Sequence, residues 1–185
     1  MQDSLEGKLL VAMPGMGDPR FAHAVIVMCS HSRNEAMGII INKPKDALTL
    51  GDVLQHLGIE AKAHAPRTVM DGGPVKPDRG YVLHSRDFTA PNATIEITGD
   101  VSMTATREVL EAIGGDGAPQ QFLLALGCSG WGAGQLEDEL RQNAWLIVEP
   151  DDAIIFGAEH EDKWERAIHK LGLDPAQLTA AAGRA

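Results

Sequence analysis

The most informative stretch of this sequence is Leu126-Gly127-Cys128-Ser129-Gly130-Trp131-Gly132-Ala133-Gly134-Gln135-Leu136-Glu137. It continues the apolar run 122–126, which is typical of a strand buried on both faces. An acidic segment that we expect to be helical follows it. Glycine is used where the backbone takes a positive φ or approaches another group closely. The four glycines therefore predict a tight turn between a buried strand and a helix.

This glycine-rich turn has two interpretations. A passage from a strand to a helix N-terminus can bind an anion, because free amides and the helix dipole meet there. The glycine spacing, however, matches neither the dinucleotide-binding fingerprint nor the P-loop, and Glu137 and Asp138 already offset the dipole. The alternative is a structural turn that packs Trp131 against the core. We favour the structural turn and keep a ligand role open.

Composition restricts the class of protein. The 185 residues are 44% hydrophobic, enough for one core, so we expect a single domain over 1–185. The net charge of −10 repels phosphate backbones and anionic lipids, which argues against nucleic-acid and membrane partners. No apolar stretch approaches the ~18 residues of a membrane span, and the start does not resemble a signal peptide. Cys29 and Cys128 form no disulfide framework. We therefore expect a cytoplasmic bacterial protein.

Hydrophobic patterning predicts an irregular alternation of strands and helices, which favours an α+β fold over a regular βαβ array. A T-x-x-D capping box from Thr49 to Asp52 predicts a helix that ends at Gly58. Further helices are expected from near Thr104, after the glycine-rich turn, and from Trp164 to Leu171, with Asp174-Pro175 starting a last one. The predicted strands are 8–13, 25–30, 37–42, 68–70, 80–84, 94–98, 122–126, 144–148 and 153–156.

Two other loops carry polar or glycine-rich motifs. Asp18-Pro19 is a ready N-cap and first helical residue, but the same loop could instead present Asp18 and Arg20 to a ligand. Asp71-Gly72-Gly73-Pro74-Val75 is first of all a turn. Arg79 and His84 flank the strand that follows, where either could line a cleft or simply be solvated.

The histidines and cysteines give no metal or nucleophile motif. None of the seven histidines has the spacing of a zinc site, so we predict no metal. Cys29 and His31 are two residues apart near the end of a strand and would share a face there, as a Cys–His pair requires. The alternative is that Cys29 is a buried, inert residue. No nucleophile elbow is present.

Several motifs in fixed order resemble the YqgE/AlgH family of bacterial proteins, over about residues 7–156. The resemblance implies an α+β fold with a bifurcated, partly barrel-like mixed sheet surrounded by helices, with C-terminal helices over 160–182. It implies no catalytic residues and no cofactor, although some members are named as transcriptional regulators. The matching motifs are Gly7 to Pro14, Asp18 to Phe21, Met37 to Pro44, Gly72 to Val75, Arg79 to His84, Gly130 to Glu137 and Asn143 to Leu146.

Together these observations predict a regulatory or binding domain for a small ligand or a protein partner. One alternative is an enzyme, such as a hydrolase, that uses the same cleft with His31 or His84 as base. Direct DNA binding is disfavoured by the charge and the lack of a basic helix-turn-helix. The candidate ligand-binding residues lie where the motif loops are expected to converge: Asp18, Arg20, Asn42, Lys43, Gly72, Gly73, Arg79, Gly130, Trp131, Gly132 and Gln135.

Overall fold

The long strand β9 (Phe122–Gly132) joins the two parts of a curled sheet. The computed structural model describes residues 3–182. β9 pairs with β6 through its first seven residues, with β5 at Ala125 and Leu126, and with β3 from Ser129 to Gly132. The pairing of β5 with β9 is parallel and the other pairings are antiparallel, so the sheet is mixed.

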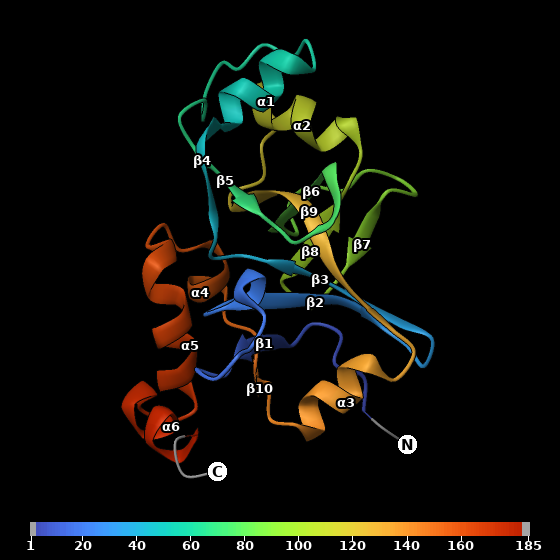
Figure 1. Cartoon of the computed structure of the whole chain (residues 1–185). Helices are drawn as coiled ribbons and strands as arrows, with labels where there is room; N and C mark the ends of the chain where they lie inside the picture. Colours follow the sequence, from blue (N-terminus) through green and yellow to red (C-terminus); the bar gives the residue numbers. More distant parts are fainter. Residues whose placement is uncertain (1–2, 183–185) are drawn as a thin grey trace.

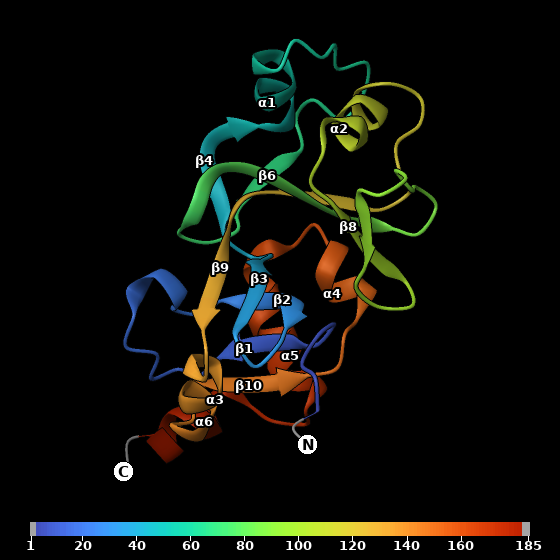
Figure 2. The same cartoon turned by 90° about the vertical axis from the view of Figure 1, so that its right-hand side faces the viewer.

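The sheet order is β10-β1-β2-β3-β9-β6-β8-β7, with β5 branching from β9 and carrying β4. Figures 1 and 2 show the two parts one above the other, with β9 passing between them. This is the bifurcated, partly barrel-like α+β fold that the resemblance implied. The other strands are β1 (Leu9–Ala12), β2 (Val25–His31), β3 (Glu35–Ile40), β4 (Pro44–Thr49), β5 (Thr68–Asp71), β6 (Val75–Ser85), β7 (Thr94–Glu96), β8 (Val101–Thr104) and β10 (Trp145–Val148).

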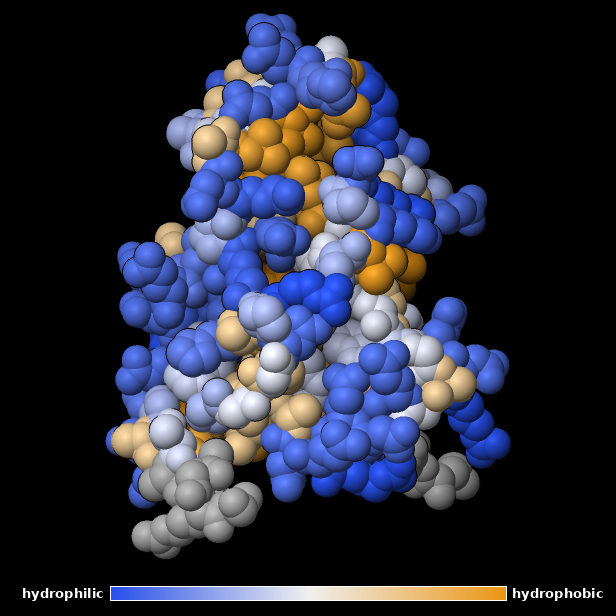
Figure 3. Space-filling model, in the orientation of Figure 1, coloured by the Kyte–Doolittle hydropathy of each residue, from blue (hydrophilic) through white to orange (hydrophobic). Residues whose placement is uncertain are grey.

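The helices cover the sheet in three places, each over its own apolar cluster. α1 and α2 cover the upper part, α3 lies beside the lower part, and α4 to α6 flank one side (Figure 1). In the view of Figure 3, apolar surface gathers in the upper half, over the region of α1 and α2. The helices are η1 (Pro19–Phe21), α1 (Leu50–His56), α2 (Arg107–Gly114), α3 (Gln135–Arg141), α4 (Asp152–Phe156), η2 (His160–Asp162), α5 (Lys163–Lys170) and α6 (Pro175–Ala182).

Local capping chemistry confirms three predicted helix starts. Thr49 and Asp52 form the reciprocal capping box at α1. The Asp18 carboxylate accepts a hydrogen bond from the Arg20 backbone N–H at 3.0 Å and so starts η1. Asp174 does the same for the Ala176 N–H at the start of α6. These polar side chains satisfy amides that have no partner inside their helices.

The segment 153–156 was predicted as a strand and is instead the helix α4. Asp151 accepts a hydrogen bond from the Ala153 N–H and starts the helix. Ile154 and Ile155 are both buried. A five-residue element is too short to show a 3.6-residue period, so its apolar run looked like a strand.

The glycine-rich segment was predicted to leave the strand after Leu126, but β9 continues to Gly132. Its last residues pair with β3, from Gly38 opposite Ser129 to Glu35 opposite Gly132. The turn into α3 comes only at Gly134, which has a φ of +73°. The glycines thus lie mostly inside a strand, where they allow another backbone to come close.

The sequence also misplaced other boundaries. β4 and β8 were not predicted, and β6 begins five residues before Gly80. α2 begins at Arg107 rather than near Thr104. Leu171, predicted to face inward, is 41% exposed, whereas the predicted burial of Ile39-Ile40-Ile41 is confirmed.

Candidate functional site

Gly72 and Gly73 bring the β5–β6 connection against β9. The Gly72 N–H donates to the Leu126 carbonyl at 2.9 Å, and the Ser129 hydroxyl donates to the Gly72 carbonyl at 3.3 Å. A Cβ on Gly73 would overlap the carbonyl oxygen of Cys128. These two glycines therefore allow a close approach between two backbones of the chain itself, beyond the turn that the sequence predicted.

Trp131, Gly132 and Gln135 gather around Glu139 of α3. The indole N–H of Trp131 donates to Glu139 Oε1 at 3.2 Å, and that of Trp145 donates to the same oxygen at 3.0 Å. Gln135 accepts from the Gly132 N–H at 3.0 Å and donates to Glu139 Oε2 at 3.1 Å. Trp131 is 5% exposed, so it packs against the core as the structural interpretation of the glycine-rich turn required. These side chains already satisfy one another.

The residues predicted in the first loop and after β3 also have partners within the chain. Asn42 accepts from the Val25 N–H at 2.9 Å and donates to the His23 carbonyl at 2.7 Å. Lys43 donates to the Ala22 carbonyl at 2.7 Å. Asp18 and Arg20 form an exposed ion pair with each other at 2.7 Å. Asn42 and Lys43 thus hold the loop that carries Asp18 and Arg20 against the sheet.

The predicted residues therefore form neighbouring groups with different partners. Lys43 lies next to the Gly72 turn, because its carbonyl accepts from the Asp71 N–H at 2.7 Å. Arg79 lies further along the β6 hairpin, with its guanidinium carbon 5.4 Å from the centre of the Tyr81 ring. A ligand role for any of these residues stays a prediction.

The two histidines considered as bases have both ring nitrogens engaged. His31 Nδ1 accepts from the Leu5 N–H at 3.0 Å, so Nε2 carries the proton and donates to Glu137 at 2.7 Å. His84 is fully buried, with Nδ1 2.8 Å from the Ser85 carbonyl and Nε2 2.8 Å from the Thr104 hydroxyl. Burial lowers the pKa of His84. Neither ring offers a substrate a free lone pair.

Cys29 and His31 do not share a face, contrary to the strand-based expectation. A register shift between Met28 and Ser30 interrupts the pairing of β2 with β3. Cys29 consequently packs into the cluster beneath α4 and α5, while His31 contacts Glu137 on α3. The bulge turns the two side chains to opposite sides of the sheet.

A separate cavity of about 250 Å³ lies where the loop before β5 meets the end of α4 and η2. Its polar groups come from Arg67, Thr68 and His160, and the rest of its wall is mostly apolar. Arg67 lies over the Phe122 ring, 4.0 Å from its centre, and donates to the Phe122 carbonyl at 2.8 Å. The lining residues are Leu50, Pro66, Arg67, Thr68, Phe122, Leu123, Leu124, Phe156, Gly157, Ala158 and His160.

His160 contributes a polar atom with an unmet hydrogen-bonding need. Its Nδ1 is buried and has no hydrogen-bond partner, although its ring lines the cavity. Burial, followed by the charges of Lys163 and Arg67, lowers the pKa of His160 to about 4. The ring is therefore neutral near pH 7 and can accept a proton if an anion comes close.

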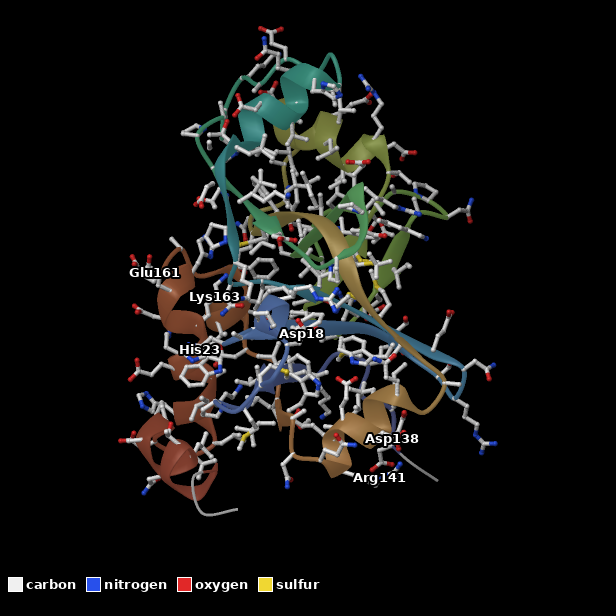
Figure 4. All side chains as sticks on the ribbon, in the orientation of Figure 1. Asp18, His23, Asp138, Arg141, Glu161 and Lys163 are labelled. Atoms are coloured by element: carbon white, nitrogen blue, oxygen red, sulfur yellow. The ribbon has the colours of Figure 1, made fainter. Side chains whose placement is uncertain are left out.

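Lys163 is fully buried and lies close enough to the cavity residue His160 to act on its charge. Its ammonium donates to the carbonyls of Ile41 at 3.0 Å and Ile155 at 2.9 Å. Burial, with a smaller effect from Arg166, lowers its pKa to about 7. Figure 4 places Lys163 where α5 meets the sheet, whereas Asp138 and Arg141 on α3 form a surface ion pair. Two cationic side chains, Lys163 and Arg67, thus act on His160.

Sequence reasoning missed Arg67, His160 and Lys163. Charged residues and histidines are ordinarily solvated, and none of the three belongs to a recognisable motif. One signal was present for Lys163, because it precedes Ala167 by four residues and so shares the inward face of α5. Within residues 3–182 no three His, Cys, Asp or Glu side chains gather to hold a metal ion.

The fold and the pocket define a class of protein: an α+β domain built on a curled sheet, with a small, largely apolar pocket at its side. The chain belongs to the AlgH-like family, whose model matches residues 9–176. This confirms the resemblance. No helix in the described part of the chain is long and apolar enough to cross a bilayer.

Relatives match along nearly the whole chain. The UPF0301 protein of Caulobacter vibrioides strain NA1000 is 46% identical over 183 residues, 98% of this chain and 94% of its own. The UPF0301 protein of Paracoccus denitrificans is 46% identical over 185 residues, 98% of this chain and 97% of its own. The solution structure of AlgH from Pseudomonas aeruginosa matches with a TM-score of 0.80 at 37% identity, covering 97% of each chain. A crystal structure of a Corynebacterium diphtheriae protein has a TM-score of 0.75 at 18% identity over 96% of this chain and 92% of that one, and supports the fold alone.

Proposed function

We propose that this protein is a regulatory domain of the bacterial cytoplasm that binds a small ligand in the pocket between Arg67 and His160. The observation that carries the proposal is a cavity of about 250 Å³ lined by the ring of His160, whose buried Nδ1 has no hydrogen-bond partner. A buried polar atom without a partner costs about 1–3 kcal/mol. A ligand that supplies the missing hydrogen bond recovers this free energy.

The composition of the pocket supports the proposal. Ligand sites are concave and mostly apolar, with a few convergent polar groups, and typically measure roughly 300–1,000 Å³. This pocket is near the lower bound, so it suits a ligand of about amino-acid size. Leu50, Leu124 and Phe156 supply apolar wall, and Arg67 with His160 supplies the polar end.

Other functions have weaker support. The enzyme alternative takes His31 or His84 as its base, and the ring nitrogens of both are engaged by partners. Direct DNA binding would need a basic surface, which a net charge of −10 does not favour.

The test is to fill the pocket from its rim. Ala158 is exposed and lines the cavity, so Ala158→Trp adds a ring there without removing core packing. Ala176→Trp on α6 is the matched control, because it adds the same ring at an exposed position outside the lining. A library of small metabolites is screened by thermal shift and by chemical-shift perturbation. We expect hits with the native chain and the control that the Ala158→Trp variant loses. Metabolites that still bind to the Ala158→Trp variant would show that their binding site lies outside this pocket.

A further inference from the structure

The charged side chain that lines the pocket is a cation, and the lining includes no carboxylate. Arg67 lines the cavity, and the buried Lys163 acts on the charge of the lining residue His160, in a chain whose net charge is −10. None of the ion pairs found among residues 3–182 includes either side chain. Buried cations are ordinarily paired with an anion. Neither cation is therefore paired directly with a carboxylate of the described residues.

The guanidinium of Arg67 is oriented by its neighbours. One face lies on the Phe122 ring, and a single Nη2–H donates to the Phe122 carbonyl. A guanidinium has five N–H donors in a planar fork that matches a carboxylate in two parallel hydrogen bonds. Because stacking fixes the plane of the fork, its remaining donors are held in position before any ligand arrives.

We infer that the pocket takes a small organic carboxylate, whose oxygens bind the Arg67 guanidinium and His160 Nδ1 while its apolar part packs against Leu50, Leu124 and Phe156. The inference rests on the proposed function, since it names the chemistry of the ligand for the same pocket. The carboxylate supplies both of the things that the pocket lacks, a negative charge and a partner for the buried ring nitrogen.

A carboxylate fits better than a phosphate. One guanidinium and one imidazole can satisfy the two oxygens of a carboxylate, whereas a phosphate brings three or more oxygens and a second charge. Most of the remaining wall is apolar and would leave those additional oxygens without donors. The wall instead suits a short aliphatic or aromatic substituent.

Binding should be coupled to proton uptake by His160. Arg67 from the loop before β5 and Lys163 from α5 act on this ring and lower its pKa to about 4. The acidic residues of its own segment, Glu159, Glu161 and Asp162, are exposed. A bound carboxylate beside the ring offsets the two cations and favours the imidazolium. Affinity should therefore increase as the pH falls.

The experiment compares carboxylates with their own amides. Propionate and benzoate, propionamide and benzamide, and inorganic phosphate are titrated into the full chain by calorimetry in two buffers of different ionisation enthalpy. We expect the acids to bind at least about tenfold more tightly than the amides. We also expect the apparent enthalpy of binding to depend on the buffer, because a proton is taken up.

Variants separate the two polar groups. Arg67→Gln should weaken binding of the acids at least about tenfold, with Arg67→Lys in between because it keeps the charge but not the fork. His160→Asn keeps a hydrogen-bonding group near the Nδ1 position but cannot titrate, so it should bind without proton uptake. His169→Asn, at an exposed position on α5, is the matched control and should behave as the native chain. Thermal unfolding of each variant confirms that it is folded.

The outcomes distinguish the ligand chemistry from the pocket. Amides that bind as tightly as acids, and are lost in the Ala158→Trp variant, would overturn the carboxylate inference and keep the proposed function. Phosphate binding more tightly than every acid would also overturn it. If the Ala158→Trp variant binds every probe as tightly as the native chain does, binding does not occur in this pocket, and the proposed function fails as well.

Discussion

Replacing Lys163 with Met tests whether a lysine can be buried with its charge unpaired. Its ammonium is fully buried and donates to two backbone carbonyls rather than to a carboxylate. Burial lowers its pKa to about 7, whereas a lysine in an unfolded chain keeps a pKa near ~10.4. Between these values the unfolded chain binds one more proton than the folded chain. The free energy of unfolding of the native chain must then increase with pH.

The size of the effect follows from the linkage relation. One proton corresponds to about 1.4 kcal/mol per pH unit, so the native chain should gain about 2.5 kcal/mol relative to Lys163→Met between about pH 7.5 and pH 9.5. The increase levels off above the unfolded pKa, where the gained stability is kept, and there is no increase below the folded pKa. The variant also leaves two carbonyls unpaired, each costing about 1–3 kcal/mol, but this cost is the same at every pH.

Urea unfolding followed by tryptophan fluorescence measures both chains across this range, with unchanged m-values as the check on two-state behaviour. Lys170→Met is the matched control. Lys170 also donates to two backbone carbonyls, at 3.2 and 3.1 Å, but it does so at the surface, where its ammonium keeps its water. Parallel pH profiles for the native chain and Lys163→Met would refute the reasoning.

Three further predictions follow from burial, backbone contact and charge. Gly73→Ala should lower the free energy of unfolding by roughly 3 kcal/mol or more, because a Cβ there meets a carbonyl oxygen at a φ of +142°, whereas Gly17→Ala, in open space, should stay within about 0.5 kcal/mol. Urea unfolding compares the two. Burial raises the pKa of Cys29 to about 12, and Cys128 is buried as well, so native-state alkylation near neutral pH should be slow at both thiols. Fast modification of Cys29 would contradict its burial. Finally, labelled duplex DNA titrated at low salt should show no sequence-dependent retention, given the charge of −10.

The elements that could be predicted from the sequence are those whose signal is local. A capping box such as Thr49 with Asp52 involves four consecutive residues, and a run such as Ile39-Ile40-Ile41 needs only its own side chains to predict burial. β4, with the exposed and half-buried sequence Pro44–Thr49, carries no such pattern. It is a strand because its partner β5 is held beside β9, which a local pattern cannot encode.

The candidate pocket was hidden for a related reason. Arg67 and His160 are far apart in the sequence and meet only because α4 is a helix that leads into η2 beside β5. The sequence predicted a strand in place of α4 and so could not bring the two together. The glycine motifs, in contrast, were visible in the sequence but serve contacts between backbones of the chain itself.

The position of β1 has a consequence for how the chain is made. β1 lies between β2 and β10, so Leu9 pairs with Val27 on one side and with Val148 on the other. During synthesis the first strand emerges early, but its second neighbour is translated more than a hundred residues later. At ~5–20 residues per second, that edge of β1 stays open for several seconds or longer. An open edge of apolar sequence is a template for pairing with other chains, so this edge of β1 is exposed to aggregation until β10 is made.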